Sequence, residues 1–236
     1  MYLDEEHRII RCQYPFNGKE LQQESNYQQA VTVQKAIERK LSKENLWVPY
    51  THEMKKAIAM GAIKQLDTEE LILHGKKPQH YVTHFPVKNP SSISTKVRSV
   101  SNAAMNNQKS GLSFNDCLRE APNAINGLME VLLRWRSMEV AVLLDLSKAY
   151  QSIATGQKER HLRRLLWRES PEHAWKIYAY DRVQFGDDIA ALCLELARKI
   201  AAEAGMGIDS QAAKQIIRNG YIDDIAAGGT LEDAFT

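Results

Sequence analysis

The segment Glu139–Ser147, EVAVLLDLS, constrains the fold of this chain more than any other part of the sequence. Its apolar residues follow one another without alternation, as in a strand that is covered on both faces. We therefore expect a central strand of a sheet, with Asp145 at its exit from the core. A carboxylate at such an edge is costly unless something positive binds it. Asp145 is therefore a candidate ligand for a cation.

A second acidic site lies near the end of the sequence, at Tyr221–Asp224, which reads YIDD. Asp223 and Asp224 are adjacent in a predicted turn between two hydrophobic segments. Together with Asp145 they would repel one another, and a bound cation would resolve that repulsion. Mg²⁺ prefers a few carboxylates together with phosphate oxygens, and two ions about 3.5 to 4 Å apart suit phosphoryl transfer. An isolated Asp-Asp pair is more often a solvated turn, so this hypothesis depends on the rest of the sequence.

Hydrophobic periodicity predicts a mixture of helices and strands. The expected helices cover residues 26–44, 49–60, 121–136 and 189–203, and the expected strands cover residues 62–66, 81–87, 97–100 and 139–147. Residues 158–168 read as a basic helix and residues 175–186 as a strand pair. The segment 88–98 combines Pro90, three serines and positive charge, which predicts a mobile hairpin tip.

Composition excludes several other classes of protein. The chain has 236 residues, is 44% hydrophobic and carries a formal net charge of +2, as is typical of a globular protein. It has no apolar run of about 18 residues and begins with a charged segment, so neither a membrane span nor a secretory signal is expected. Cys12, Cys117 and Cys193 lie far apart and have no histidines at zinc-ligand spacing. We therefore expect reduced, packed thiols in an intracellular protein.

Five collinear blocks of the sequence resemble reverse transcriptases. DLSKAY (Asp145–Tyr150) and YIDD resemble the two metal-binding motifs of that family, and VQFG (Val183–Gly186) lies between them, where the family has its template- and nucleotide-positioning motif. Upstream, HFPVKNPSSISTKVRSV and SGLSFNDCLREAPN resemble the fingers and the start of the palm in pol polyproteins of BEL/Pao-type LTR retrotransposons. The similarity begins near Tyr14 and runs to the end of the chain.

This resemblance implies an α+β right-hand polymerase fold, with fingers and a palm whose antiparallel sheet is backed by helices. The fingers would comprise approximately residues 1–110 and 152–187, and the palm approximately residues 111–151 and 188–236. The sequence would be C-terminally truncated, with the thumb absent and the RNase H and integrase regions downstream in a full-length polyprotein. The expected location is the cytoplasm, in virus-like particles, or the nucleus.

The resemblance also implies roles for individual residues. Asp145, Asp223 and Asp224 would hold two Mg²⁺ ions, or Mn²⁺, with the Leu146 carbonyl as a further ligand. The implied nucleotide-binding residues are Lys88, Arg98, Leu146, Tyr150, Phe185 and Gly186. The implied contacts to the nucleic-acid backbone are Arg160, Arg163, Arg164 and Tyr221. The substrates would be dNTPs, and the partner an RNA or DNA template with its primer.

Each of these roles has a structural alternative. Tyr150 would otherwise belong to the core, and Lys88, Arg98 and the basic stretch would otherwise form solvated surface. In the resemblance, the ring of Tyr150 would collide with a ribose 2′-hydroxyl and so select dNTPs. This argues against a further hypothesis, an RNA-directed RNA polymerase, since ribonucleotides need room at that position.

The sequence departs from the family pattern at two places. Ser101–Asn102 stand where the family has an aromatic residue and an aspartate, and Asp187–Asp188 follow Gly186 where a small residue and a proline are usual. We attribute the acidic pair to the start of a helix, where negative charge interacts favourably with the helix dipole. A non-catalytic nucleic-acid-binding or scaffold protein derived from a decayed retroelement is therefore the alternative hypothesis.

Overall fold

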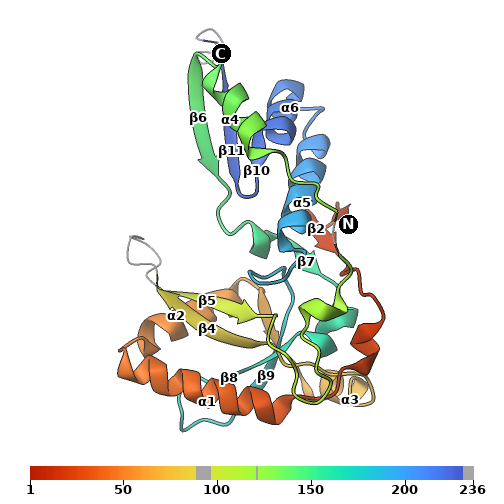
Figure 1. Ribbon diagram of the computed structural model, residues 1–236, viewed down its shortest axis with the longest axis vertical. Coiled ribbons are helices and arrows are strands. Elements are labelled where there is room, and N and C mark those ends of the chain that lie inside the picture. The colour runs from red at the N-terminus through yellow and green to blue at the C-terminus, as the bar shows by residue number, and fades with distance from the viewer. Residues whose placement is uncertain (89–96, 121, 231–236) are drawn as a thin grey trace. The chain divides into compact units, whose positions relative to one another are not determined.

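The computed structural model of the protein describes residues 1–88, 97–120 and 122–230. The fold is α+β, with six α-helices and small antiparallel sheets in this part of the chain (Figure 1). Two compact units are present. Unit 1 comprises residues 1–12, 120–153 and 189–236, and unit 2 comprises residues 13–119 and 154–188. No helix among the described residues has the length and apolar character needed to cross a membrane.

The chain passes between the units at residues 12/13, 119/120, 153/154 and 188/189. The predicted boundaries between fingers and palm lie at 110/111, 151/152 and 187/188, close to the last three of these crossings. Residues 1–12 belong to unit 1 and not to the unit that contains the rest of the N-terminal half. The assignment of unit 2 as fingers and unit 1 as palm stays a prediction.

Unit 1 is built around a three-stranded antiparallel sheet of order β10-β11-β6. Helices α4 and α6 both contact β11 and each other, so they back the sheet together, and α5 packs on α6 (Figure 1). The hairpin β1–β2 also contacts α5. In chain order the elements are β1 (Tyr2–Asp4), β2 (Ile9–Cys12), α4 (Leu128–Arg136), β6 (Val140–Asp145), η3 (Tyr150–Ser152), α5 (Ala190–Ala204), α6 (Ser210–Asn219), β10 (Gly220–Tyr221) and β11 (Asp224–Gly229).

Unit 2 contains a three-stranded sheet of order β3-β9-β8 and the hairpin β4–β5. Helix α1 packs on β4 and β8, and α2 packs on β3 and β5. Its elements are η1 (Lys19–Gln22), α1 (Tyr27–Lys43), α2 (Trp47–Ala59), β3 (Ile63–Gln65), α3 (Thr68–Leu73), β4 (Thr83–Lys88), β5 (Val97–Asn102), η2 (Asn115–Cys117), β7 (Ala154–Thr155), η4 (Gln157–Leu162), β8 (Arg164–Trp167) and β9 (Lys176–Tyr180).

The predicted helices over residues 26–44, 49–60 and 189–203 are confirmed as α1, α2 and α5, and the predicted strands are present as β3, β4, β5 and β6. Helices α3 and α6 were not predicted, although each begins at an aspartate that caps it. Asp67 accepts from the Glu70 N–H at 2.8 Å in a capping box. Asp209 accepts from the N–H groups of Gln211 and Ala212 at 2.9 Å. Such side-chain caps satisfy N–H groups that a helix start leaves unbonded.

Three other expectations are wrong. The helix expected from residue 121 begins only at Leu128, after a stretch without regular structure around Pro122. Residues 158–168 form η4 and then strand β8 instead of a basic helix, and residues 175–186 contribute one strand, β9, between β3 and β8. The tip of the hairpin predicted over residues 88–98 lies outside the described residues.

Strand β6 was expected in the centre of a sheet, and this too is wrong for the described part of the chain. It lies at the sheet edge and pairs there with β11. The exposed fractions of Val142, Leu143 and Leu144 are 43%, 60% and 48%. The apolar run correctly predicts a strand, but the described residues do not cover both of its faces.

Candidate functional site

Asp145 and Asp224, which are far apart in the sequence, are direct cross-strand partners in the sheet of unit 1. The Leu146 N–H donates to the Asp223 carbonyl at 2.8 Å. This bond identifies Asp145 and Asp224 as a non-hydrogen-bonded pair of the antiparallel ladder. The Cα atoms of such a pair lie about 4.5 Å apart, and both side chains stand on the same face. Both residues are exposed, and neither forms an ion pair with a described Lys or Arg.

The turn between β10 and β11 consists of Ile222 and Asp223. Ile222 has a φ of 55°, a left-handed conformation that is unusual for a β-branched residue. Strained backbone of this kind is concentrated at functional sites, where the surrounding structure holds it. The half-buried Asp223 lies near Tyr150, whose phenol pKa is raised by burial and by the negative charge of Asp223. The structure thus brings Tyr150 of the first motif close to the turn of the second.

Two polar side chains that the sequence analysis missed hold the base of this hairpin. Asn126 Nδ2 donates to the carbonyls of Ile217 at 2.9 Å and Gly220 at 2.8 Å. Arg198, which is 4% exposed, donates to the Gly220 carbonyl at 3.3 Å and pairs with the buried Glu195. A Cβ at Gly220 would collide with the Arg198 guanidinium. The available signal was a glutamate and an arginine three residues apart on the apolar face of helix α5, where both are buried.

The described residues contain no group of three or more His, Cys, Asp or Glu arranged to hold a metal ion. Asp145 and Asp224 nevertheless present two carboxylates from facing positions, and Mg²⁺ is often held by one or two carboxylates together with water and substrate phosphates. The Leu146 carbonyl, predicted as a further ligand, accepts from the Ala149 N–H at 3.2 Å. A carbonyl oxygen has two lone pairs, so this bond leaves one of them for another partner.

The predicted nucleotide-positioning turn, Phe185–Gly186, lies in unit 2 and is held from two sides. Ser101 Oγ donates to the Phe185 carbonyl at 2.5 Å, and Asn115 Nδ2 donates to the Gly186 carbonyl at 2.9 Å. Gly186 has a φ of +100°, and a Cβ there would lie 2.6 Å from the Ser101 carbonyl oxygen. The serine that departs from the family pattern therefore bonds directly to the turn.

Asp187 is buried within a polar cluster, so the helix-dipole explanation for this residue is wrong. Helix α5 begins only at Ala190. The Asp187 carboxylate accepts from the Tyr14 hydroxyl at 2.5 Å, from the Gln184 N–H at 3.2 Å and from the Arg163 guanidinium at 3.1 Å. Arg163 also lies over the Tyr14 ring, 4.4 Å from its centroid. The cluster anchors the chain directly after the turn.

Lys88 and Arg98 are exposed on the hairpin β4–β5 of unit 2. Lys88 Nζ pairs with Glu44 at 2.8 Å, and this hydrogen bond lowers the pKa of the Glu44 carboxyl. A pair at this degree of exposure contributes little free energy, so a phosphate can compete for the lysine. Arg98 forms no ion pair with the residues that the structure describes.

The predicted backbone contacts from Arg160, Arg163 and Arg164 do not agree with the structure. Their exposed fractions are 4%, 1% and 2%. Arg160 pairs with Asp181 and Glu70, Arg163 belongs to the Asp187 cluster, and Arg164 donates to Gln79 at 2.8 Å. Buried guanidinium groups with protein partners do not face a template. Tyr221, the fourth predicted contact, is half-buried in β10.

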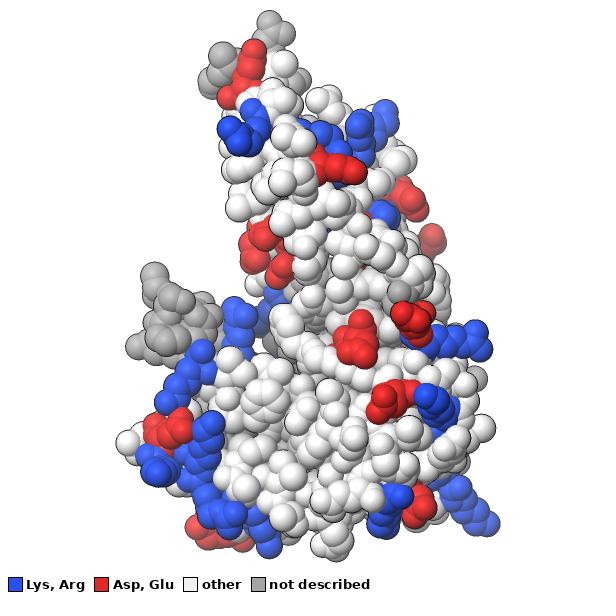
Figure 2. Space-filling view, viewed as in Figure 1, with Lys and Arg blue, Asp and Glu red and all other residues white. Residues whose placement is uncertain are grey.

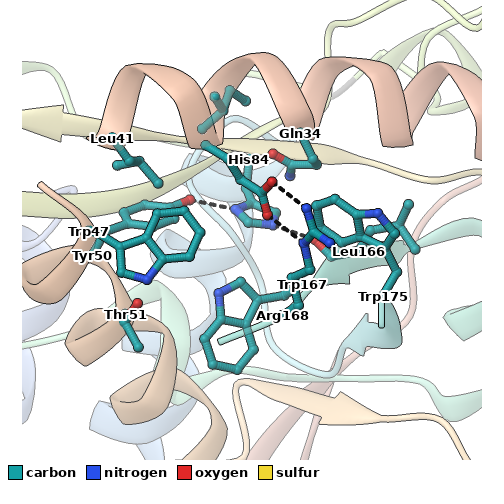
Figure 3. Close-up of a pocket in the computed structure, with 12 residues that line it drawn as sticks. Gln34, Leu41, Trp47, Tyr50, Thr51, His84, Leu166, Trp167, Arg168 and Trp175 are labelled. Atoms are coloured by element: carbon teal, nitrogen blue, oxygen red, sulfur yellow. Dashed lines mark hydrogen bonds and ion pairs between the residues drawn. The ribbon is translucent and has the colours of Figure 1, made fainter. Parts of the chain in front are cut away.

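A small aromatic pocket in unit 2 lies between α1, α2 and β8 (Figure 3). Its volume is about 20 Å³, room for about one water molecule. His84 contributes to it and is held by the Tyr50 hydroxyl at 2.5 Å and by the Leu166 carbonyl at 2.9 Å. Burial lowers the pKa of His84 to about 4. These contacts make His84 a neutral part of the core, and the pocket is too small for a nucleotide.

Each unit therefore contains one part of the predicted site. The acidic residues, with Leu146, Tyr150 and Tyr221, lie in unit 1, whereas Lys88, Arg98, Phe185 and Gly186 lie in unit 2.

In comparisons with known proteins, no family model matches the chain and no curated protein is significantly similar to it. Its function is therefore inferred from its own residues and their geometry.

Proposed function

We propose that this chain comprises the fingers and palm of an RNA-directed DNA polymerase, which adds dNTPs to a primer 3′-hydroxyl by two-metal phosphoryl transfer. The observation that carries the proposal is the pairing of Asp145 with Asp224 across β6 and β11. Like charges directly opposite each other destabilise a sheet. Their presence without a described basic partner is explained if the site serves to bind cations. In this proposal the fold is a right-hand polymerase fold, with unit 1 as palm and unit 2 as fingers.

The chain's own residues have distinct tasks in this reaction. Asp145, Asp223 and Asp224 would hold the divalent ions, which when bound would activate the primer hydroxyl and stabilise the leaving pyrophosphate. Tyr150, beside Asp223, excludes a ribose 2′-hydroxyl. The Phe185–Gly186 turn supports the incoming nucleotide, and Lys88 and Arg98 meet its phosphates. Positioning and charge stabilisation are most of what phosphoryl transfer requires.

A primer-extension assay tests the activity. The full chain is given an RNA template with a DNA primer, dNTPs and Mg²⁺ or Mn²⁺, and is compared with Asp145→Asn. We expect template-dependent extension that falls at least about 100-fold in the variant, because a metal ligand is lost. Glu172→Gln is the control, since that exposed carboxylate lies in unit 2 and is not among the predicted site residues. Equal extension by Asp145→Asn and the unchanged chain would refute the assignment.

Thermal unfolding tests the metal site independently of turnover. In EDTA, Asp224→Asn should stabilise the protein by about 0.2 to 1 kcal/mol, because it removes a like-charge pair from facing positions. Mg²⁺ or Mn²⁺ should raise the melting temperature of the unchanged chain, since a ligand that binds only the folded state stabilises it. The variant should show a smaller rise. A variant that is less stable in EDTA, or equally stabilised by the ions, contradicts a cation site here.

The alternative is a non-catalytic nucleic-acid-binding or scaffold protein, and the burial of the three arginines favours its non-catalytic part, because the template contacts expected of a polymerase at these positions are not available. Arg160, Arg163 and Arg164 supply no exposed charge for a template. This alternative predicts no dNTP incorporation by the unchanged chain with either metal ion. It also predicts that binding of a template–primer is unaffected by EDTA and by Asp145→Asn.

A further inference from the structure

A basic groove lies in unit 1 between the C-terminal end of α4 and helix α6, with a volume of about 560 Å³. Arg134, Lys214 and Arg218 line it, together with polar side chains that include Gln211 and Asn219. None of the described residues that line it is acidic. Figure 2 shows basic side chains gathered over α6. We call this feature the α4–α6 groove; none of its lining residues belongs to the acidic site.

The guanidinium of Arg134 is held in place at the groove. Its Nε donates to Asn219 Oδ1 at 3.0 Å, and one terminal nitrogen donates to the Arg218 carbonyl at 2.7 Å. Its acidic neighbour Glu130 is 3.9 Å away, with a side chain that is 75% exposed. Such a distant, solvated partner neutralises little of the charge. Arg134 therefore presents an oriented positive group to the groove.

Lys214 and Arg218 add two further charges from α6. Both are exposed, and neither forms an ion pair with the described residues. Residues four apart on a helix lie about 5 to 6 Å from each other at Cβ, and like charges at this spacing repel. The nearby Asp209 is engaged by the N–H groups at the start of α6. An anionic ligand in the groove would relieve the repulsion.

The wall of the groove is fixed to the sheet. Gln215 Nε2 donates to the Gly228 carbonyl at 2.7 Å, and the Gly228 N–H donates to Gln215 Oε1 at 2.9 Å. This pair of bonds ties the middle of α6 to β11. Asn219, which orients Arg134, is 4% exposed. Because the helix and the arginine are both held, binding here orders few additional groups.

We propose that the α4–α6 groove binds the phosphodiester backbone of a single nucleic-acid strand. The groove has a volume of about 560 Å³, which exceeds the space that a single phosphate group needs, and its charges come from three separate side chains. Such contacts recognise phosphates without reading sequence. Binding at this site does not require polymerase activity, so it goes beyond the proposed function and would persist in a catalytically inactive chain.

Fluorescence anisotropy with a labelled oligothymidylate tests this proposal in the 236-residue chain that carries Asp145→Asn. The test variant is Lys214→Gln with Arg218→Gln, and the matched control is Lys40→Gln with Lys43→Gln on α1, where both lysines are exposed. Loss of two phosphate contacts should reduce the slope of log affinity against log salt by about 1.4, at about 0.7 per contact for single strands. The affinity should fall about 10-fold or more at low salt, and the control should change it less than twofold.

Three results would overturn the proposal. One is an unchanged salt slope in the test variant, and another is an equal loss in the control, which would show an effect of net charge alone. The third is complete displacement of the oligonucleotide by millimolar inorganic phosphate, which would indicate a site for a small anion. Lys214→Arg with Arg218→Lys keeps both charges and should keep binding, and it shows whether a loss comes from charge or from misfolding.

Discussion

At the scale of single residues, Gly186 determines whether the turn after Val183 can form. Its φ of +100° lies in the left-handed region, and the carbonyl oxygen of Ser101 occupies the space that a Cβ would need. Glycine alone meets both conditions without strain. The close approach also allows Ser101 to donate to the Phe185 carbonyl. The hairpin β4–β5 and the turn are therefore fixed to each other at one point.

Replacement of Gly186 by alanine should destabilise unit 2. The unfavourable φ alone costs about 1 to 3 kcal/mol, and the clash with a backbone oxygen adds to this because that atom cannot rotate away. Gly18→Ala separates the two effects, since Gly18 has a φ of +97° but no atom lies within 4 Å of the position that its Cβ would occupy. Urea unfolding followed by circular dichroism should show the larger loss for Gly186→Ala. Equal losses would mean that the close approach to Ser101 is unimportant.

The residues of the candidate site were predictable to different degrees. Asp145, Asp223 and Asp224 could be identified from their positions beside apolar strands, and Gly186 from its motif. The roles of Asp187 and Arg163 could not, because each is decided by the other and by Tyr14, far away in the sequence. From the sequence, a run of arginines is expected to be exposed, because the acidic residues that would pair with buried arginines are far away in the chain. Arg160 is a second example, because its buried guanidinium pairs with Asp181 and Glu70, which are also distant in the sequence.

At the scale of elements, local hydrophobic periodicity predicts a helix or strand correctly when that element has an apolar face that it buries. Helices α1, α2 and α5 are elements of this kind. The residue range of strand β6 was also predicted correctly. Whether β6 is covered depends on other segments, and the described residues leave Val142, Leu143 and Leu144 exposed. Helix α4 adds exposed apolar side chains, with Met129 at 68% and Leu133 at 61%. An uncovered apolar edge strand can pair with another chain.

Leu143→Lys should therefore reduce self-association of this protein without reducing its stability. Leu143 is 60% exposed on the edge strand, and a lysine at such an edge discourages strand pairing between chains. Light scattering after size exclusion, over a range of concentrations, should show less dimer and aggregate for this variant. Val48→Lys on α2 is the control, because Val48 is 78% exposed but lies on a helix of unit 2. An equal improvement from both substitutions would point to general solubility instead of the β6 edge.

At the scale of the whole molecule, the two units differ in how acid should affect them. Unit 2 contains six of the seven histidines, and His7 is the one in unit 1. Burial lowers the pKa of His80 and of His84 to about 4, and it also lowers the pKa of the buried His74. In the unfolded chain these imidazoles have their ordinary pKa of about 6.5. Between these values the unfolded state binds more protons, so acid favours unfolding of unit 2.

The free energy of unfolding of unit 2 should be constant above about pH 7 and should fall as the pH drops from about 6.5 towards 4. Each buried histidine contributes a slope of up to about 1.4 kcal/mol per pH unit, so His80 and His84 together contribute up to about 2.7 near pH 5, and His74 adds to this. Tryptophan fluorescence reports on this unit in a Trp135→Phe background, because the remaining tryptophans, Trp47, Trp167 and Trp175, all lie in unit 2. His84→Gln should reduce the slope by up to about 1.4 kcal/mol per pH unit, whereas His173→Gln, at an exposed position, should leave it unchanged. A flat profile between pH 7 and 4.5 would show that the buried imidazoles are not held neutral by the fold.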